Sequence, residues 1–182
     1  MEYIEGTGSQ YLSLGVIFDG SPLEIRMNAT FSIPGQEQDL IGSVVAIQQD
    51  GSFAIGFFEG RTIFLYNRPN QRIDLRFDGT EREYEIVATL EGEQRTLTVN
   101  GSSVTGSGVT ANNGILYVFR GGENYMPARM KLHYLSIRSR GEIVIDAIPV
   151  VVDNVACMYN RITRQFLTNQ GTGNFIPGPQ KT

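Results

Sequence analysis

Apolar and polar residues alternate with a period of two along most of the chain. Between Leu23 and Ile33 every second residue is apolar, and the residues between them are polar. The same alternation returns in segments 72–77, 83–90 and 97–99. A period of two places successive side chains on opposite faces of a strand, so these segments predict half-buried β-strands.

Three further segments are apolar on both faces: Leu40 to Ile47, Phe53 to Phe58 and Ile63 to Tyr66. A strand that is covered on both sides needs no polar face. We therefore expect these segments to form the middle of the core.

Turn residues separate the predicted strands at short intervals. The pairs are Asp19-Gly20, Asp50-Gly51, Glu59-Gly60, Asp78-Gly79, Glu91-Gly92, Asn100-Gly101 and Asn113-Gly114. Glycine and asparagine tolerate the positive φ of tight hairpin turns. Antiparallel strands with short loops leave a sandwich, a jelly roll or a closed barrel as candidates. The number of strands favours an all-β fold, a two-sheet antiparallel β-sandwich.

The apolar phase slips by one residue between Met130–Tyr134 and Leu135–Ile137. Such a slip predicts a β-bulge or a strand that passes from one sheet to the other.

The length of 182 residues fits one domain. We expect a single sandwich over residues 1–176 and a tail over residues 177–182, where the sequence Pro-Gly-Pro-Gln-Lys-Thr leaves the domain. Cys157 is the only cysteine and lies in an apolar run, which predicts a buried thiol.

The formal net charge of -4 and the scattered basic residues argue against a nucleic-acid partner. The N-terminal segment does not resemble a secretion signal, and the apolar stretches fall short of the roughly 18 residues that a membrane span needs. The sequence therefore predicts a soluble domain without a membrane span.

Two blocks at the ends of the chain resemble a known family. The opening block YIEGTGSQYL (residues 3–12) is similar to the first strand of concanavalin A-like lectin and laminin G-like modules. The closing block combines IPV (148–150), VACMYN (155–160), QFLTN (165–169) and GTGNF (171–175), and LTVNG (97–101) resembles a hairpin of the same modules. One departure is Ser-Leu-Gly at residues 13–15, where the family often has Asp-Thr-Gly.

The resemblance implies a concanavalin A-like jelly roll over the whole domain. It also implies that Met158, Tyr159, Phe166 and Phe175 pack a closing hairpin onto the opening strand. Such modules occur in bacteriophage virion proteins and in surface proteins of gut bacteria, and the fold often binds glycans.

The resulting prediction is a non-enzymatic structural or adhesion domain of a phage virion (fibre, tail or capsid decoration) or a related surface protein. Its expected location is the virion or the extracellular surface, and its expected partners are other virion or surface proteins and a host cell-surface glycan. A homo-oligomer is compatible with this reading. A dedicated carbohydrate-binding module is the alternative, and a glycoside hydrolase is the less favoured one.

Catalytic chemistry finds little support in the sequence. Glu81, Glu83 and Glu85 alternate along one strand face, and a glycosidase needs such paired carboxylates. Exposed strands show the same pattern, and the chain has no tryptophan to serve as a sugar platform. His133 is the only histidine, so a surface or structural role is the simpler interpretation. We predict no enzyme and no catalytic residue.

Candidate ligand residues come from two segments that we expect to be loops. One loop holds Tyr66, Asn67 and Arg68, and the other holds Arg120, Asn124 and Tyr125. Tyrosine offers a stacking face and asparagine offers amide hydrogen bonds, as sugar recognition requires.

No metal site and no cofactor are predicted. Calcium is common in the family and would need several oxygen ligands, for example from Asp19, Asp50 or Asp78. Each of these aspartates precedes a glycine, so turn formation is the simpler explanation.

Overall fold

The computed structural model describes residues 1–31, 37–44, 52–58, 62–67, 71–76, 82–108, 113–122 and 127–180, without the side chain of Asn67. These residues form strands and no helix. The strands are β1 (Ile4–Thr7), β2 (Leu12–Phe18), β3 (Leu23–Thr30), β4 (Gln38–Ser43), β5 (Phe53–Phe58), β6 (Thr62–Asn67), β7 (Arg72–Arg76), β8 (Glu83–Glu91), β9 (Gln94–Val99), β10 (Ser102–Ser107), β11 (Gly114–Val118), β12 (Arg129–Ser139), β13 (Glu142–Val152), β14 (Val155–Asn160), β15 (Gln165–Leu167) and β16 (Ile176–Pro177).

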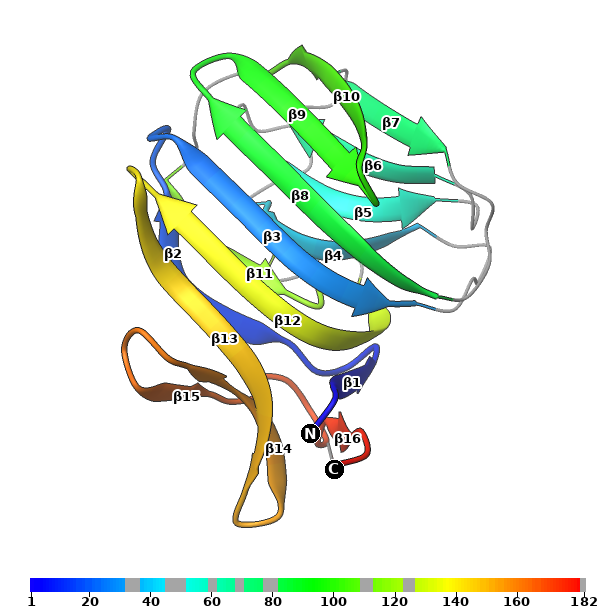
Figure 1. Ribbon diagram of the computed structural model, residues 1–182, viewed down its shortest axis with the longest axis vertical. Helices are drawn as coiled ribbons and strands as arrows, with labels where there is room; N and C mark the ends of the chain where they lie inside the picture. The colour runs from blue at the N-terminus through cyan, green and yellow to red at the C-terminus, as the bar shows by residue number, and fades with distance from the viewer. Residues whose placement is uncertain are drawn as a thin grey trace.

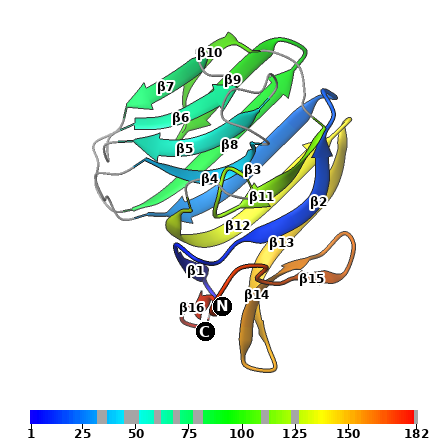
Figure 2. The same cartoon turned by 180° about the vertical axis from the view of Figure 1, so that it is seen from behind.

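Two antiparallel sheets pack face to face, which confirms the predicted sandwich (Figure 1). Sheet A has the order β10-β9-β8-β3-β12-β13-β14-β15, and β1 and β16 join it beside β12. Sheet B has the order β2-β11-β4-β5-β6-β7 and faces the viewer in Figure 2. The inner faces of both sheets supply one hydrophobic core, which holds Ile25, Phe57 and Leu135 among its buried side chains.

The period-two pattern is confirmed in the strands that carry it most clearly. In β3 and β8 buried and more exposed residues alternate, so that one face enters the core and the other carries polar side chains. The segments that are apolar on both faces form β4 and β5 at the centre of sheet B, and β6 beside them.

The predicted Asn100-Gly101 turn joins β9 to β10, with φ values of 48° and 83°. Positive φ at both central residues gives the backbone twist that matches two paired strands. This hairpin shows why the turn residues marked strand boundaries in the sequence. The predicted turns at Asp50, Glu59 and Asp78 lie outside the described residues.

The phase slip in the sequence is a β-bulge in β12, and β12 stays within sheet A. Leu132 pairs with Ala29 and Tyr134 pairs with Asn28, so His133 is one extra residue on β12. The bulge lets Leu132 and Leu135 both reach the core. His133 and Tyr134 then both lie on the outer side of the sheet.

The two ends of the chain meet beside β12 (Figure 1). β16 pairs with β1, and the amide of Gly178 donates to the carbonyl of Tyr3 at 2.9 Å. The chain therefore stays attached beyond residue 177, where the sequence placed the start of a free tail, because these backbone groups find partners on the opening strand. Lys181 and Thr182 lie outside the described residues.

The aromatic residues of the closing block divide between two places. Phe175 is buried, pairs with Ala156 and lies with its ring centroid 4.9 Å from that of Phe119. Tyr159 and Phe166 instead pack on each other, on β14 and β15, and Phe166 is half exposed. The expectation that all of these aromatics pack onto the opening strand is therefore wrong for Phe166, which the short strand β15 carries away from the core.

Candidate functional site

The outer face of sheet B brings together side chains from all six of its strands. Cross-strand partners in an antiparallel sheet share a face. The register therefore defines a row across the sheet, and its members are Ser13, Tyr117, Gly42, Ala54, Tyr66 and Arg72. Small residues occupy the middle of the row, and Tyr117 and Tyr66 lie on either side of them.

A turn after β11 covers the middle of this face. It begins at Phe119, which has a φ of 69° and donates its amide to the carbonyl of Leu40 at 2.8 Å. The carbonyl of Gly121 then accepts from the amide of Val44 at 2.8 Å. The same carbonyl lies so close to Gly42 that a Cβ there would approach it to 2.7 Å. The small residues of the row therefore make room for this turn.

The carboxyl group of Asp39 lies beneath the turn. Asp39 is buried on β4 and pairs with Gly56 on β5. Burial raises the pKa of Asp39 from 3.8 to about 7, and the nearby carboxylate of Glu37 adds to the rise. Burial disfavours the charged form of a carboxyl group, so Asp39 titrates near neutral pH.

Arg120 in this turn and two tyrosines beside it form a cluster that we call the arginine–tyrosine cluster: Tyr11, Tyr117 and Arg120. The guanidinium carbon of Arg120 lies 4.0 Å from the ring centroid of Tyr11. The two tyrosine rings meet edge to face with centroids 5.9 Å apart. The Nε of Arg120 is buried and has no hydrogen-bond partner. A buried donor without a partner is costly, so it needs a specific explanation, such as a bound water, ion or ligand.

The other side of the same face carries a second arginine on aromatic rings. Arg72 lies 4.3 Å over the ring centroid of Phe64 and 5.2 Å over that of Phe58. Its Nε is 2.5 Å from Oδ1 of Asp74. This ion pair already engages the guanidinium of Arg72. Arg120 in the arginine–tyrosine cluster is therefore the better hydrogen-bond donor to a polar ligand on this face.

The structure places part of the sequence-predicted ligand set on this face. Tyr66 lies on strand β6 and not in a loop, and Arg120 lies in the turn after β11. Asn67 ends β6, and its side chain is outside the described part of the chain. Arg68, Asn124 and Tyr125 also lie outside the described residues. The two predicted segments therefore contribute to one face of sheet B.

Sequence reasoning missed Asp39, Tyr11 and Tyr117. One signal was available, because Asp39 is an acidic residue directly before an apolar run that predicted a central strand. Tyr11 lies in the opening block, which indicated the fold and said nothing of a ligand. Its proximity to Tyr117 comes from the pairing of β2 with β11, which local sequence patterns do not reveal.

A polar cluster on the outer face of sheet A includes the only histidine. Nε2 of His133 lies 2.9 Å from Oγ1 of Thr30, and its Nδ1 lies 4.0 Å from Oε2 of Glu83. The order hydroxyl, imidazole and carboxylate is that of a hydrolase triad. However, 4.0 Å exceeds the length of a hydrogen bond. Thr30 also lies between two paired strands, whose ladders use the amides that an oxyanion hole would need.

The predicted row of glutamates is a solvated strand face where the structure describes it. Glu83 accepts a hydrogen bond from Asn28, and Glu85 lies 3.8 Å from Arg26. Their side chains are 49% and 51% exposed. Half-exposed carboxylates that contact neighbouring polar side chains are typical of the solvated face of an antiparallel sheet. Glu81 lies outside the described residues.

The aspartates considered as calcium ligands do not assemble a site in the part of the chain that the structure describes. Asp19 accepts from the amide of Ser21 and pairs with Arg140, and these contacts lower its pKa. Asp50 and Asp78 are outside the described residues, and the described ones hold no cluster of three or more His, Cys, Asp or Glu suited to a metal ion.

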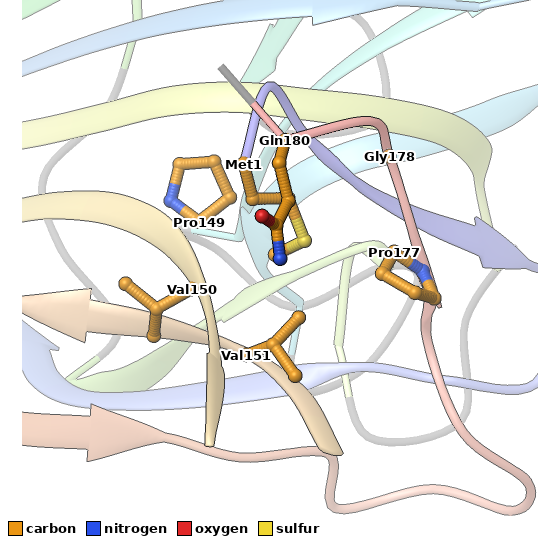
Figure 3. A pocket seen from close by; sticks show the side chains of 7 residues that line it. All are labelled: Met1, Pro149, Val150, Val151, Pro177, Gly178 and Gln180. Atoms are coloured by element: carbon orange, nitrogen blue, oxygen red, sulfur yellow. The ribbon is translucent and has the colours of Figure 1, made fainter. Parts of the chain in front are cut away.

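A pocket of about 460 Å³ lies between β13 and the ends of the chain (Figure 3). Its lining is Met1, Pro149, Val150, Val151, Pro177, Gly178 and Gln180. The side chains are apolar except for the amide of Gln180. A sugar needs several convergent polar groups, so this pocket suits a saccharide less well than the arginine–tyrosine cluster does.

The described residues include no helix that is long and apolar enough to cross a membrane. At the level of sequence, no family model and no curated protein matches the chain.

Solved structures nevertheless share the fold. Domains LG4-5 of the mouse laminin α1 chain match with a TM-score of 0.59 and 15% identity, over 78% of this chain and 42% of that chain. A Bacteroides ovatus protein put forward as carbohydrate-binding matches with a TM-score of 0.62 and 11% identity, over 94% and 58%. The CBM40 module of a Ruminococcus gnavus sialidase, bound to α2,3-sialyllactose, matches with a TM-score of 0.57 and 11% identity, over 75% and 89%.

The chain thus spans less than half of the laminin structure that it matches. At these identities the likeness concerns the fold. Together with the two antiparallel sheets, the matches confirm the resemblance that the end blocks indicated: the protein has the concanavalin A-like sandwich fold of laminin G domains.

Proposed function

We propose that the domain binds a carbohydrate at the arginine–tyrosine cluster on the outer face of sheet B. The observation that carries the proposal is the guanidinium of Arg120, which lies 4.0 Å over the ring of Tyr11 and keeps a buried Nε without a partner. Tyrosine rings stack on the apolar face of a sugar, while a guanidinium donates to hydroxyl or carboxylate oxygens.

The remaining ligand candidates lie on the same face or follow from the sequence. Tyr66 flanks the covered middle of the sheet on the side opposite Tyr117. Asn67, Arg68, Asn124 and Tyr125 stay candidates because their segments begin at this face. The fold of a sialyllactose-bound module and of a protein put forward as carbohydrate-binding supports a glycan as the ligand class.

The wider role follows from the resemblance of the end blocks. We propose an adhesion domain without catalytic activity, carried by a phage virion or a related surface protein, with other virion or surface proteins as neighbours. A dedicated carbohydrate-binding module would use the same proposed site, the arginine–tyrosine cluster. The support for the phage setting is the sequence resemblance alone.

A glycan array that includes neutral, sulfated and sialylated saccharides tests the proposal. We expect saturable binding to one class, and a loss of at least about tenfold in affinity for Arg120→Ala, since one charge-assisted contact contributes about 1.5–3 kcal/mol. Arg26→Ala on the outer face of sheet A is the matched control and should bind like the wild type. Folded protein that binds no saccharide would refute the function. Binding that survives Arg120→Ala would refute the site.

A further inference from the structure

The hairpin of β13 and β14 extends beyond the body of the sandwich in both views (Figures 1 and 2). Its turn is formed by Asp153 and Asn154, with φ values of 50° and 65°. Near its turn the hairpin projects past the core, because Val151 and Val155 are 42% and 43% exposed. Further along β14, Ala156, Cys157 and Met158 are buried.

The outer face of this hairpin is apolar, together with β15. Register partners share this face: Ile148 with Tyr159, Tyr159 with Phe166, and Val152 with Val155. Cys157, opposite Val150, also points to this side but is buried. On this face Val155 is 43% exposed and Phe166 is 49% exposed. We call this surface the hairpin face.

The rest of sheet A shows what a solvated outer face looks like in this protein. On β3 and β8 the outer residues, except Val87, are polar or charged, such as Arg26, Asn28 and Glu85. Exposed apolar side chains gathered on one surface mark an interaction site. The hairpin face therefore indicates an interaction with an apolar surface.

The charges at the two ends of β14 are opposite. Asp153 lies in the turn before β14, and Arg161 and Arg164 lie in the turn after it. Arg161 is paired with Asp146 at 2.6 Å, whereas Arg164 makes no ion pair within the described residues. The six residues of β14 separate the acidic and the basic end by about 20 Å.

We propose that the hairpin face binds the hairpin face of a second copy of this chain in a two-fold, antiparallel arrangement. In a two-fold pairing the same patch is used twice. Asp153 of each copy then lies opposite Arg164 of its mate, and the valines and Phe166 are buried between the copies.

Such a dimer leaves both sheet B faces pointing outward, because the copies meet through sheet A. Its small apolar area places it among weak, concentration-dependent associations. The proposal does not depend on the carbohydrate site proposed at the arginine–tyrosine cluster, which lies on sheet B.

Sedimentation velocity from low micromolar to several hundred micromolar protein tests the dimer. We expect a reversible monomer–dimer equilibrium in the wild type, and at least about tenfold weaker association for Val155→Asp, which buries an unpaired charge in the interface. Ile17→Asp is the matched control, because Ile17 is 53% exposed on β2 of sheet B. It should dimerise like the wild type.

Charge reversal identifies the partner as a second copy. Asp153→Arg and Arg164→Asp should each weaken the dimer, and the double variant should restore it, because the two opposite charges have only exchanged places. The turn strain of Asp153→Arg is common to the single and double variants, so their comparison isolates the charge. A wild type that stays monomeric throughout the range, or a dimer that Val155→Asp leaves unchanged, would overturn the proposal.

Discussion

The backbone of Gly121 lies directly against the carboxyl group of Asp39. A Cβ on residue 121 would approach Oδ2 of Asp39 to 2.1 Å and its Cγ to 2.8 Å. Asp39 lies on β4 and Gly121 follows β11. Their contact therefore holds the turn that carries Arg120 against the sheet below it.

Gly121→Ala is therefore expected to destabilise the protein by about 1–3 kcal/mol, the usual cost of overpacking a buried site. Urea unfolding measures the change. Gly101→Ala is the control, because a Cβ there meets nothing within 4 Å and only its φ of 83° is strained.

The double variant Asp39→Ala/Gly121→Ala shows whether the clash is the cause. Removing the carboxyl group deletes the two closest contacts of the new methyl group, so the cost of Gly121→Ala should shrink in this background. Additive effects of the two substitutions would contradict the explanation.

Asp39 predicts a specific dependence of stability on pH. Its pKa is raised by burial and by Glu37 from 3.8 to about 7. Between these values the folded chain holds a proton that the unfolded chain releases. The contribution of Asp39 to the free energy of unfolding therefore decreases as the pH rises from about 4 to about 7, and is constant above.

Asp39→Asn should remove this dependence. At pH 8 it should raise the free energy of unfolding, by at most about 4 kcal/mol from the size of the pKa shift, and near pH 4 it should change little. Urea unfolding at both pH values measures the difference, with Asp153→Asn on an exposed turn as the control. An equal effect of Asp39→Asn at both pH values would show that the carboxyl group does not titrate as described.

The sequence predicted those features of the fold that depend on neighbouring residues. Alternation along β3 and β8 determines which side of each strand enters the core, and Asn100-Gly101 determines a hairpin turn through its own backbone preferences. The bulge in β12 also followed from a local slip of the apolar phase.

The candidate site could be predicted only in part, because it depends on strand order. Arg120 and Tyr66 were identified by residue type, but Tyr66 was expected in a loop because turn residues follow it closely. The contact of Tyr11 with Arg120 joins segments more than a hundred residues apart. Phe166 was expected to pack on the opening strand, since its motif resembled a closing block; the path of β15 places it on the hairpin face.

The two phenylalanines of the closing block offer a matched pair for stability. Phe175 is 3% exposed and packs on Phe119 beneath the opening strand, while Phe166 is 49% exposed. Phe175→Ala should cost about 3–5 kcal/mol, as for other buried aromatic truncations, because it leaves a cavity. Phe166→Ala should cost much less at protein concentrations below those of dimer formation. Equal costs in urea unfolding would show that Phe175 does not secure the closure of the chain.

Cys157 should react slowly with thiol reagents in the folded protein. The thiol is buried, as its apolar surroundings predicted, and burial raises its pKa. The thiolate is the nucleophile, so a raised pKa lowers the reactive fraction at pH 7 to 8, and burial adds a barrier to access. Alkylation by iodoacetamide, followed by mass spectrometry, should be much slower in the folded protein than in urea.

The control is Ser102→Cys in a Cys157→Ser background, which places a thiol on the exposed edge strand β10. Comparable rates for the native Cys157 and the thiol at position 102 would show that the hairpin opens readily, and that the surface assigned to the second copy is not rigidly held.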